Sequence, residues 1–219
     1  MKLVQNLNVR WLGRITYAEG LEIQERLVAE RVDSTEGSDH LLLLEHEPVY
    51  TIGRLPDQSS LRVVESLPHP VVQTNRGGKA TYHGPGQLVG YAVWDLRKRG
   101  QDLHRHLRAL EAGLVELASR LGVQATVREG LTGVWVGPRK LASIGVGVRR
   151  WISMHGFALN VCGDLAGFLH ITPCGLEGVE MTSLEREGAG GMGVQKVADL
   201  AGEVFEELWS RETQGGVAL

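Results

Sequence analysis

The chain has 219 residues, of which 42% are hydrophobic and 22% charged, and its formal net charge at pH 7 is −3. This length supports one sizeable hydrophobic core rather than two, so we expect a single domain over residues 1–219 that ends in a frayed tail at 211–219. The small negative charge argues against a nucleic-acid partner. No apolar run reaches the roughly 18 residues of a membrane-spanning helix, the first residues lack a signal-peptide pattern, and two cysteines make no disulfide scaffold. We therefore expect a cytoplasmic protein with no membrane partner.

Three segments carry apolar residues at helical spacing, namely 18–31, 102–121 and 194–209. The second has the clearest pattern, a single stripe made of Leu103, Leu107, Leu110, Leu114, Leu117 and Leu121. All three are long enough to be ordinary helices of a globular domain, and each is expected to pack its apolar face on a core.

Short apolar runs between these helices predict strands at Leu41–Glu45, Val71–Thr74, Leu88–Trp94, Val123–Val127, Val134–Val136, Leu141–Val148 and His155–Val161. The helices do not alternate regularly with these strands, so a doubly wound parallel sheet is disfavoured. The predicted fold class is α/β of the α+β type, with a mixed or antiparallel sheet and helices packed on it.

The segment from Arg76 to Gln87 reads RGGKATYHGPGQ and combines tight turns with polar side chains. It matches neither GxGxxG nor GxxxxGKS/T, so a standard phosphate-binding loop is disfavoured. An exposed hairpin is the alternative, but a hairpin does not need the side chains of Arg76, Thr81, His83 and Gln87. Because Gly77 and Gly78 allow close backbone approach and a strand follows, we expect this loop to line a ligand site. Lys79 is expected at its solvated tip.

Lys140 stands directly before the apolar segment Leu141–Val148. Its position alone predicts a solvated charge at a sheet edge. The small residues of the ASIGVGV stretch leave room for a ligand or another backbone, which favours a functional interpretation.

Cys174 lies in a turn between Pro173 and Gly175, whereas Cys162 follows an apolar strand as structural cysteines do. An accessible turn cysteine suits a nucleophile, provided that a neighbouring group favours the thiolate. The sequence leaves four candidates for that group: His83, His155, His170 and Lys140. HExxH, paired CxxC and GxSxG are all absent, so we expect neither a metal site nor a serine hydrolase, and no cofactor.

Four stretches, RGGKATYHGPGQLVGY, KLASIGV, HGFALNV and TPCG, occur in this order from residue 76 to residue 175. In that order they resemble the lipoyl(octanoyl) transferase family, and the resemblance extends from about Tyr17 to Leu184. It implies a mixed α/β fold related to the catalytic domains of biotin and lipoate protein ligases. It also implies transfer of an octanoyl group from acyl carrier protein to a lysine of a lipoyl domain, without ATP. The implied acceptors are the lipoyl domains of 2-oxoacid dehydrogenase E2 subunits and the glycine cleavage H protein.

The resemblance assigns Cys174 as the nucleophile that carries the acyl group and Lys140 as the acid/base that favours its thiolate. The implied substrate-binding residues are Arg76, Gly77, Gly78, Lys79, Ala80, Thr81, Tyr82, His83, Ser143, Ile144, Gly145, Gly156, Phe157 and Ala158. Because acyl carrier proteins are acidic, the basic residues Arg97, Lys98, Arg99, Arg105, Arg108, Arg149 and Arg150 are candidates for a docking patch, with a solvated helix end as the alternative.

Three other functions stay open at this stage. An ATP-dependent lipoate or biotin ligase of the same fold would activate a free acid and need no nucleophilic cysteine. A transferase acting between lipoyl domains would reject acyl carrier protein as donor. A non-catalytic carrier-binding protein would not form an acyl adduct.

Overall fold

The computed structural model describes residues 7–34, 36–54, 60–61, 67–172, 175 and 178–213. Within these residues, seven strands form one sheet and three form a second. In spatial order the large sheet consists of β1 (Leu7–Ile15), β2 (Asp39–His46), β6 (Gln87–Val93), β10 (Ile152–Asn160), β9 (Arg139–Arg149), β8 (Leu131–Val136) and β7 (Thr126–Arg128). Only β1 and β2 pair in parallel, and every other pair in this sheet is antiparallel. The mixed sheet expected from the sequence is therefore confirmed.

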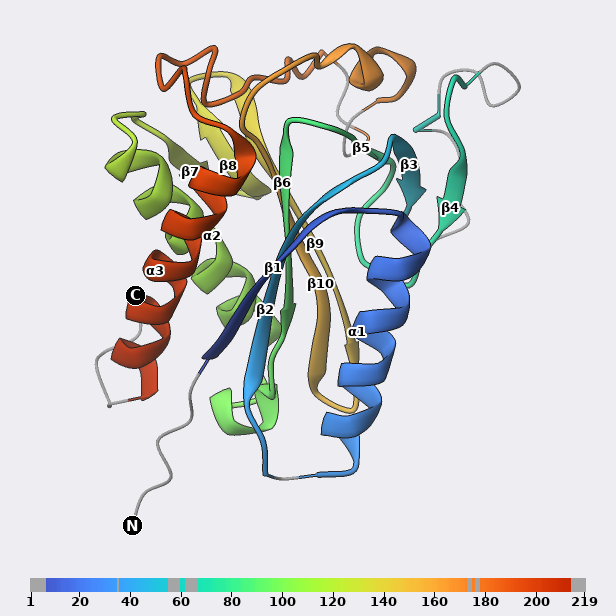
Figure 1. Ribbon diagram of the computed structural model, residues 1–219, viewed down its shortest axis with the longest axis vertical. Coiled ribbons are helices and arrows are strands. Elements are labelled where there is room, and N and C mark those ends of the chain that lie inside the picture. Colours follow the sequence, from blue (N-terminus) through green and yellow to red (C-terminus); the bar gives the residue numbers. More distant parts are fainter. Residues whose placement is uncertain are drawn as a thin grey trace.

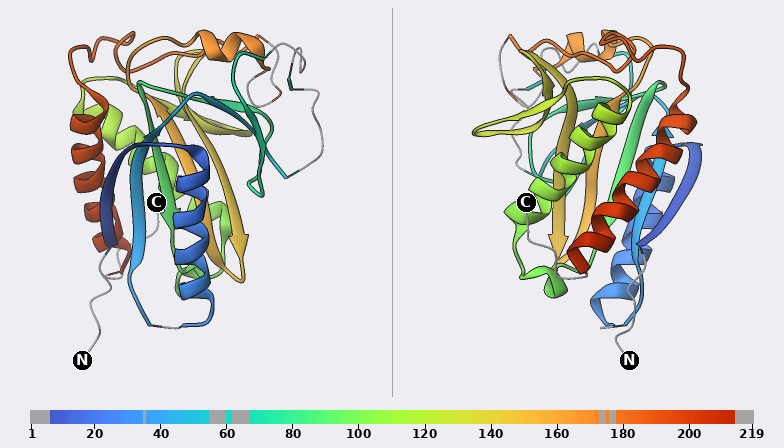
Figure 2. Two further views of the ribbon diagram at one scale, coloured as in Figure 1. Left: turned by 45° about the vertical axis from the view of Figure 1, so that its right-hand side comes forward. Right: turned by 90° about the vertical axis from the view of Figure 1, so that its left-hand side faces the viewer.

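Helices cover both faces of the large sheet (Figure 1, Figure 2). Helix α1 (Tyr17–Val32) lies on one face, and α2 (Leu103–Arg120) and α3 (Val194–Thr213) lie together on the other. The run of four leucines in β2 follows from this arrangement, because Leu41 and Leu43 pack towards α2 and α3 while Leu42 and Leu44 pack towards α1. A strand buried on both faces needs apolar residues at every position.

Polar residues fix where the first two helices begin. Thr16 and Glu19 form a capping box at α1, in which the Glu19 amide donates to Thr16 Oγ1 at 3.3 Å and the Thr16 amide donates to Glu19 Oε2 at 2.8 Å. Asp102 accepts the Arg105 amide at 3.0 Å and caps α2. The start of α1 is thereby fixed directly after β1, beside the end of the sheet that carries the site described below.

The second sheet consists of β4 (Val71–Gln73), β3 (Val49–Ile52) and β5 (Thr81–His83), with β3 in the centre. It lies beside one end of the large sheet (Figure 1). A separate small core beneath it includes Tyr50, Ile52, Ala80, Phe168 and Ile171. Two 3₁₀ helices complete the described elements, η2 (Leu96–Arg99) and η3 (Ala166–His170).

The three helices predicted from the sequence are confirmed, and each predicted strand overlaps an observed one. Strands β1, β3 and β5 were not predicted. Helix α3 continues to Thr213, so the first residues of the predicted tail at 211–219 belong to that helix, and 214–219 lie outside the described residues. No helix within the described part of the chain combines the length and apolar character needed to cross a membrane.

Candidate active site

Two rows of residues on the α1 face of the large sheet form the floor of a cavity. Across β6, β10 and β9, Val89 pairs with Ala158 and Ala158 with Ser143. In the next row Tyr91 pairs with Gly156 and Gly156 with Gly145. Directly paired residues share one face of a sheet, so each row presents small groups next to one large one. All six residues line the cavity, whose empty volume, open space included, is about 490 Å³.

The loop that joins β4 to β5, residues 74–80, covers this floor. The Gly77 amide donates to the carbonyl of Val146 in β9 at 2.8 Å. An added β-carbon at Gly145 would lie 2.9 Å from the Gly77 carbonyl oxygen, so only glycine allows the loop to approach β9 this closely. Glycine at 145 is therefore needed to seat the loop.

Arg76 holds the loop in shape from inside. Its buried guanidinium donates to the carbonyl and hydroxyl oxygens of Thr51 at 2.8 Å each, to the Gly77 carbonyl at 3.0 Å and to the Lys79 carbonyl at 2.9 Å. These bonds tie the loop to β3 and satisfy main-chain oxygens that bend back towards the cavity. Arg76 thus builds the wall of the cavity and places a positive charge beside it.

His83 extends this network and is neutral. Its Nδ1 donates to Gln87 Oε1 at 2.7 Å, and its Nε2 lies 3.3 Å from the Thr51 hydroxyl, which already accepts from Arg76. Burial lowers the pKa of His83 to about 3, and the neighbouring His46 contributes in the same direction. Since both ring nitrogens are engaged, His83 has no lone pair left to activate a thiol.

Other titratable groups at the cavity are also held neutral by burial. His46 Nε2 is hydrogen-bonded to the Tyr91 hydroxyl at 2.6 Å, and burial lowers the pKa of His46 to about 4. His155 has a pKa lowered to about 4, by burial and then by Arg76. Burial raises the pKa of Tyr17 to about 12 and that of Tyr91 well above its usual value. The cavity therefore carries little charge of its own apart from the basic side chains on its rim.

Lys140 is buried, with 1% of its surface exposed, so the interpretation as a solvated edge charge is wrong. Its Nζ donates to the Thr132 carbonyl at 3.1 Å and lies 5.1 Å from the centroid of the Trp135 ring. The β8–β9 register shifts by one residue at this point, where Trp135 pairs with Lys140 and Val134 with Ala142. Such a bulge redirects side chains, here at the start of β9, next to the turn that joins β8 to β9.

Cys174 lies outside the described residues, but the chain on both sides of it is tied to the cavity. The Thr172 amide donates to the Ser60 carbonyl at 2.7 Å, while Ser60 Oγ accepts the Ala80 amide at 3.1 Å. Ser60 thus joins the TPCG segment to the loop over the cavity. At Gly175, an added β-carbon would overlap the side chain of Lys79, which is partly buried rather than at a solvated tip.

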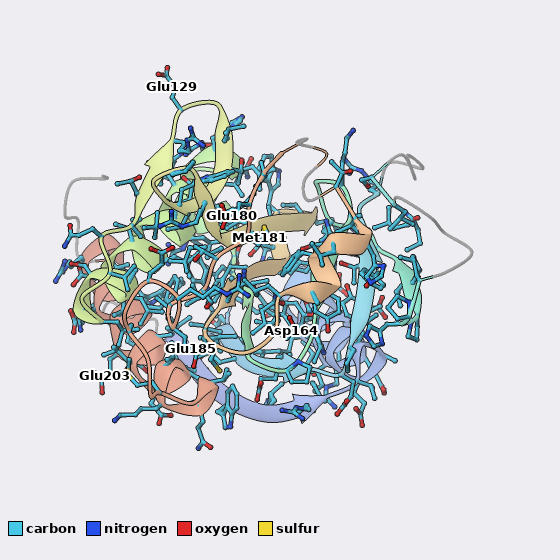
Figure 3. The ribbon with its side chains drawn as sticks, turned by 90° about the horizontal axis from the view of Figure 1, so that it is seen from above. Glu129, Asp164, Glu180, Met181, Glu185 and Glu203 are labelled. Atoms are coloured by element: carbon cyan, nitrogen blue, oxygen red, sulfur yellow. The ribbon has the colours of Figure 1, made fainter. Side chains whose placement is uncertain are left out.

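The segment that follows this turn reaches Lys140 through the main chain. The Lys140 amide donates to the Glu180 carbonyl at 2.8 Å, and the Thr182 amide donates to the Lys140 carbonyl at 2.9 Å. Figure 3 looks down on this end of the sheet, where Glu180 and Met181 are labelled. Three segments that are distant in sequence therefore meet at one end of the molecule: the 74–80 loop with β5, the start of β9, and the residues flanking Cys174.

A second hollow lies on the other side of β5, and we call it the Cys162 hollow. Its lining includes His69, Tyr82, Cys162, Asp164 and His170. Burial raises the pKa of the Cys162 thiol, and the carboxylates of Glu185 and Glu45 raise it further. Asp164 and Glu185 are labelled in Figure 3. Among the described residues, no group of His, Cys, Asp and Glu side chains is arranged to hold a metal ion.

A family model described as the lipoyl protein ligase A/B catalytic domain matches residues 16–206. The chain belongs to this family. An octanoyltransferase from Citrifermentans bemidjiense is 53% identical over 197 residues, covering 90% of this chain and 94% of the relative.

Two solved structures share the fold. A bipartite lipoate protein ligase from Thermoplasma acidophilum has a TM-score of 0.72 at 16% identity, covering 94% of this chain and 84% of that chain. The biotin protein ligase from Aquifex aeolicus has a TM-score of 0.55 at 13% identity, covering 95% of this chain and 71% of that chain. The expected relation to biotin and lipoate protein ligases is thereby confirmed at the level of the fold.

Most residues that the family resemblance assigned to substrate binding come together in the structure. The cavity lining contains Arg76, Gly78, Lys79, Ala80, Thr81, His83, Ser143, Ile144, Gly145, Gly156, Phe157 and Ala158. Tyr82 lines the Cys162 hollow instead, because side chains alternate along β5, and Gly77 packs on β9 through its main chain.

The cavity also contains residues that sequence reasoning did not assign to it, namely Tyr17, Val89 and Tyr91. His155 also lines it, while His170 is exposed on η3 at the Cys162 hollow. The alternation of large and small residues in the strand from 88 to 94 was the available signal for Val89 and Tyr91.

The proposed basic docking patch is partly used for internal contacts. Arg97 Nε donates to Asp95 at 2.8 Å, and the Arg99 guanidinium stacks on the Trp209 ring at 3.6 Å. Helix η2 and the β9–β10 hairpin, which carries Arg149 and Arg150, lie at the opposite end of the sheet from the loops that follow η3 (Figure 1).

Proposed function

We propose that this chain is a transferase that moves an octanoyl group from the thioester of acyl carrier protein, through a thioester on Cys174, to a lysine of a lipoyl domain. The observation that carries the proposal is that the residues flanking Cys174 contact both the loop over the cavity, through Ser60 and Lys79, and the main chain of Lys140. The relatives with 50–55% sequence identity are octanoyltransferases, which supports the octanoyl group as the group transferred. Such a reaction belongs in the cytoplasm, where both protein substrates are made.

The first half-reaction starts from a Cys174 thiolate paired with the Lys140 ammonium. The sulfur attacks the carbonyl carbon of the donor thioester, and the carbonyl electrons move onto oxygen. When this intermediate collapses, the bond to the donor sulfur breaks, and the departing thiolate takes a proton from Lys140. One thioester replaces another, so the step is nearly balanced in energy and needs no ATP.

The second half-reaction uses the neutral amine that Lys140 has become. The acceptor lysine, as a free amine, attacks the thioester carbonyl carbon and forms an amide. The bond to Cys174 breaks, the amine proton passes to Lys140, and the thiolate–ammonium pair is restored. Amide formation from a thioester is downhill, so this half-reaction drives the transfer.

The surroundings of Lys140 support this role. An ammonium that is 1% exposed acts through a medium of lower dielectric constant than water, so its stabilisation of a nearby thiolate is stronger. The Thr132 carbonyl and the Trp135 ring partly replace the water that Lys140 lost on burial. A buried lysine changes its protonation state more readily than an arginine does, which suits proton transfer.

The cavity supports an acyl occupant. Its apolar lining includes the side chains of Ala80, Val89 and Ala158, and its histidines are neutral. An eight-carbon chain gains free energy from this apolar contact, at about 0.8 kcal/mol per buried methylene.

Intact mass spectrometry after mixing with octanoyl acyl carrier protein tests the proposal. We expect an octanoyl adduct on the wild-type chain, discharged by a lipoyl domain such as that of an E2 subunit or the H protein. Cys174→Ser abolishes the adduct, and the matched variant Cys162→Ser retains it. An adduct that survives Cys174→Ser contradicts the proposal, and so does activity that depends on ATP and free octanoate, which would identify a ligase.

A further inference from the structure

Glu111 is a buried carboxylate in the middle of α2, and it lies outside the lining of the cavity. Its side chain is 1% exposed, whereas its ion-pair partner Arg108, one turn earlier on the helix, is 48% exposed. Glu111 Oε2 accepts from Arg108, and Oε1 accepts the amide of Gly133 in β8 at 2.9 Å. A buried charge destabilises the fold unless other charges compensate it, so the groups beyond Gly133 decide what Glu111 does.

The peptide unit between Thr132 and Gly133 links Glu111 to Lys140. Its N–H donates to the Glu111 carboxylate, and its carbonyl oxygen accepts from Lys140 Nζ at 3.1 Å. One planar peptide unit therefore lies between two buried, oppositely charged side chains, with its positive end towards the carboxylate and its negative end towards the ammonium. From the two bond lengths and the dimensions of a peptide, the charges are at most about 8 Å apart.

Gly133 has the backbone that this link requires. Its φ of +126° lies in the region that favours glycine. An added β-carbon there would lie 2.8 Å from Lys140 Cε and 2.6 Å from the Ala142 carbonyl oxygen, so Lys140 passes directly over a residue without a side chain. Gly133 lies close to the point where the β8–β9 register shifts. The bulge and the glycine together bring the Thr132 carbonyl within reach of Nζ.

The other charged side chains around this link do not replace Glu111. On the neighbouring elements they are Arg108 of α2, Arg128 of β7, Glu129 of the β7–β8 turn, Arg139 of β9, and Glu180 and Glu187 of the segment after the Cys174 turn. The three arginines carry the same charge as Lys140 and disfavour an ammonium there. The side chains of Glu129 and Glu180 are exposed, and Glu187 is paired with Arg139 at 2.7 Å (Figure 3). Within the described part of the chain, Glu111 is therefore the carboxylate that is both buried and bonded to the peptide that Lys140 contacts.

We propose that Glu111 is a positioning residue for Lys140, acting through the Thr132–Gly133 peptide to hold the lysine in place and in its ammonium form. This inference rests on the proposed function, in which the ammonium stabilises the thiolate and then gives its proton to the departing donor sulfur. The negative charge of Glu111 favours the ammonium over the neutral amine, and this attraction is stronger in the protein interior than in water. Glu111 itself gains and loses no proton during the transfer.

Glu111→Gln tests the charge, because glutamine keeps an oxygen for the Gly133 amide but is neutral. Single-turnover acylation by octanoyl acyl carrier protein is measured at about pH 6 and at about pH 8.5. We expect Glu111→Gln to react within about twofold of wild type at the lower pH, and about tenfold more slowly at the higher pH, where the variant loses the ammonium first. Glu116→Gln is the matched control on the exposed side of the same helix, where Glu116 accepts from Arg120 at 2.9 Å, and it should behave as wild type at both pH values.

Thermal unfolding gives a second test that involves no acyl transfer. It compares Glu111→Gln, Lys140→Met and the double variant. Each single change leaves a buried charge without its counterpart, so the loss of Tm in the double variant should be smaller than the sum of the two single losses, by about 3 °C.

Two results overturn the inference. One is an acylation rate in Glu111→Gln that is unchanged, or slowed by the same factor at both pH values, because a purely structural contact acts alike at every pH. The other is additivity of the two Tm losses. Failure of the proposed function is distinguishable, since wild-type protein would then form no adduct on Cys174 while the coupling in Tm would persist.

Discussion

The cavity over the large sheet and the Cys162 hollow lie on opposite sides of the three-residue strand β5, yet their electrostatics differ. Thr81 and His83 face the cavity, and Tyr82 faces the hollow. The cavity lies beside buried neutral histidines and the basic side chains of Arg76 and Lys79. The hollow holds a thiol whose pKa is raised by burial and by two carboxylates. An accessible thiol in an open hollow therefore does not identify a reactive site, because the charges around the sulfur decide whether it is a thiolate.

Replacing Lys140 gives the largest expected effect on the cavity side of this comparison. Lys140→Met should slow acylation of Cys174 by about 10³-fold, because it removes both the cation and the proton carrier. Lys140→Arg keeps the charge but cannot release a proton at neutral pH, so turnover should stay low even if the thiolate still forms. Alkylation of Cys174 as a function of pH measures thiolate formation, and rapid-quench acylation measures transfer, so together they separate the charge of Lys140 from its role as proton carrier. Wild-type turnover in Lys140→Arg would contradict a role in proton transfer.

The buried histidines beside the cavity predict a loss of stability in mild acid. Their folded pKa values of about 3 to 4 lie below the usual value near 6.5, so above pH 6.5 both folded and unfolded states are neutral and stability is full. As the pH falls from 6.5 towards 4, the unfolded chain binds protons first, and each histidine costs about 2 kcal/mol by pH 5. Urea unfolding at several pH values measures this slope. The buried His106, whose pKa burial also lowers to about 3, contributes to the same slope. His46→Gln should therefore reduce the slope by about one quarter, and an unchanged slope would show that His46 titrates alike in both states.

Gly175 tests the contact between the Cys174 turn and the cavity loop. Its φ is +67°, and an added β-carbon would overlap Lys79, so Gly175→Ala should slow acylation about tenfold as the turn moves. Gly178→Ala is the matched control, since Gly178 has a similar φ of +74° but open space around it. Both variants carry the backbone strain of about 1 kcal/mol, and only Gly175→Ala displaces Lys79. Equal acylation rates in the two variants would show that the contact with Lys79 does not position the Cys174 turn.

The Cys162 hollow should give the smallest effect. Cys162→Ser is expected to leave acylation and transfer within about twofold of wild type, because a thiol with a raised pKa is rarely ionised at neutral pH. Alkylation of Cys162 by iodoacetamide in the Cys174→Ser background should speed up when Glu185 is changed to Gln. A rate that does not change would show that burial alone sets its reactivity.

Periodicity was enough to predict much of the fold. The leucine stripe in α2 and the continuous apolar run in β2 translate directly into burial on one face or on two. Strand β1 was missed because it is a partly exposed edge strand whose sequence, LNVRWLGRI, mixes arginines with apolar residues. Strand β5 was missed because its three residues sit inside a glycine-rich motif, where the turn signals dominate.

The motifs predicted which residues gather at the candidate site, but not the burial or the hydrogen-bond partners of those residues. The sequence placed Lys140 at a strand start, and the structure shows that it is buried there, at a bulge in the β8–β9 pairing and beside Trp135. Likewise His83 and His155 were candidate bases until the structure gave their hydrogen-bond partners and surroundings. These properties depend on residues far away in the chain, which no local pattern encodes.

The span that carries Cys174 is held by main-chain hydrogen bonds at Thr172 and at Thr182, through Ser60 on one side and Lys140 on the other. With both ends fixed, one extra residue between them would change the entropy of loop closure by only a small fraction of 1 kcal/mol. The entropy of loop closure therefore depends little on the length of this span. The distance from the Cys174 sulfur to the acyl carbonyl depends on it directly, so an insertion here is expected to reduce acyl transfer by more than the change in closure entropy alone would suggest.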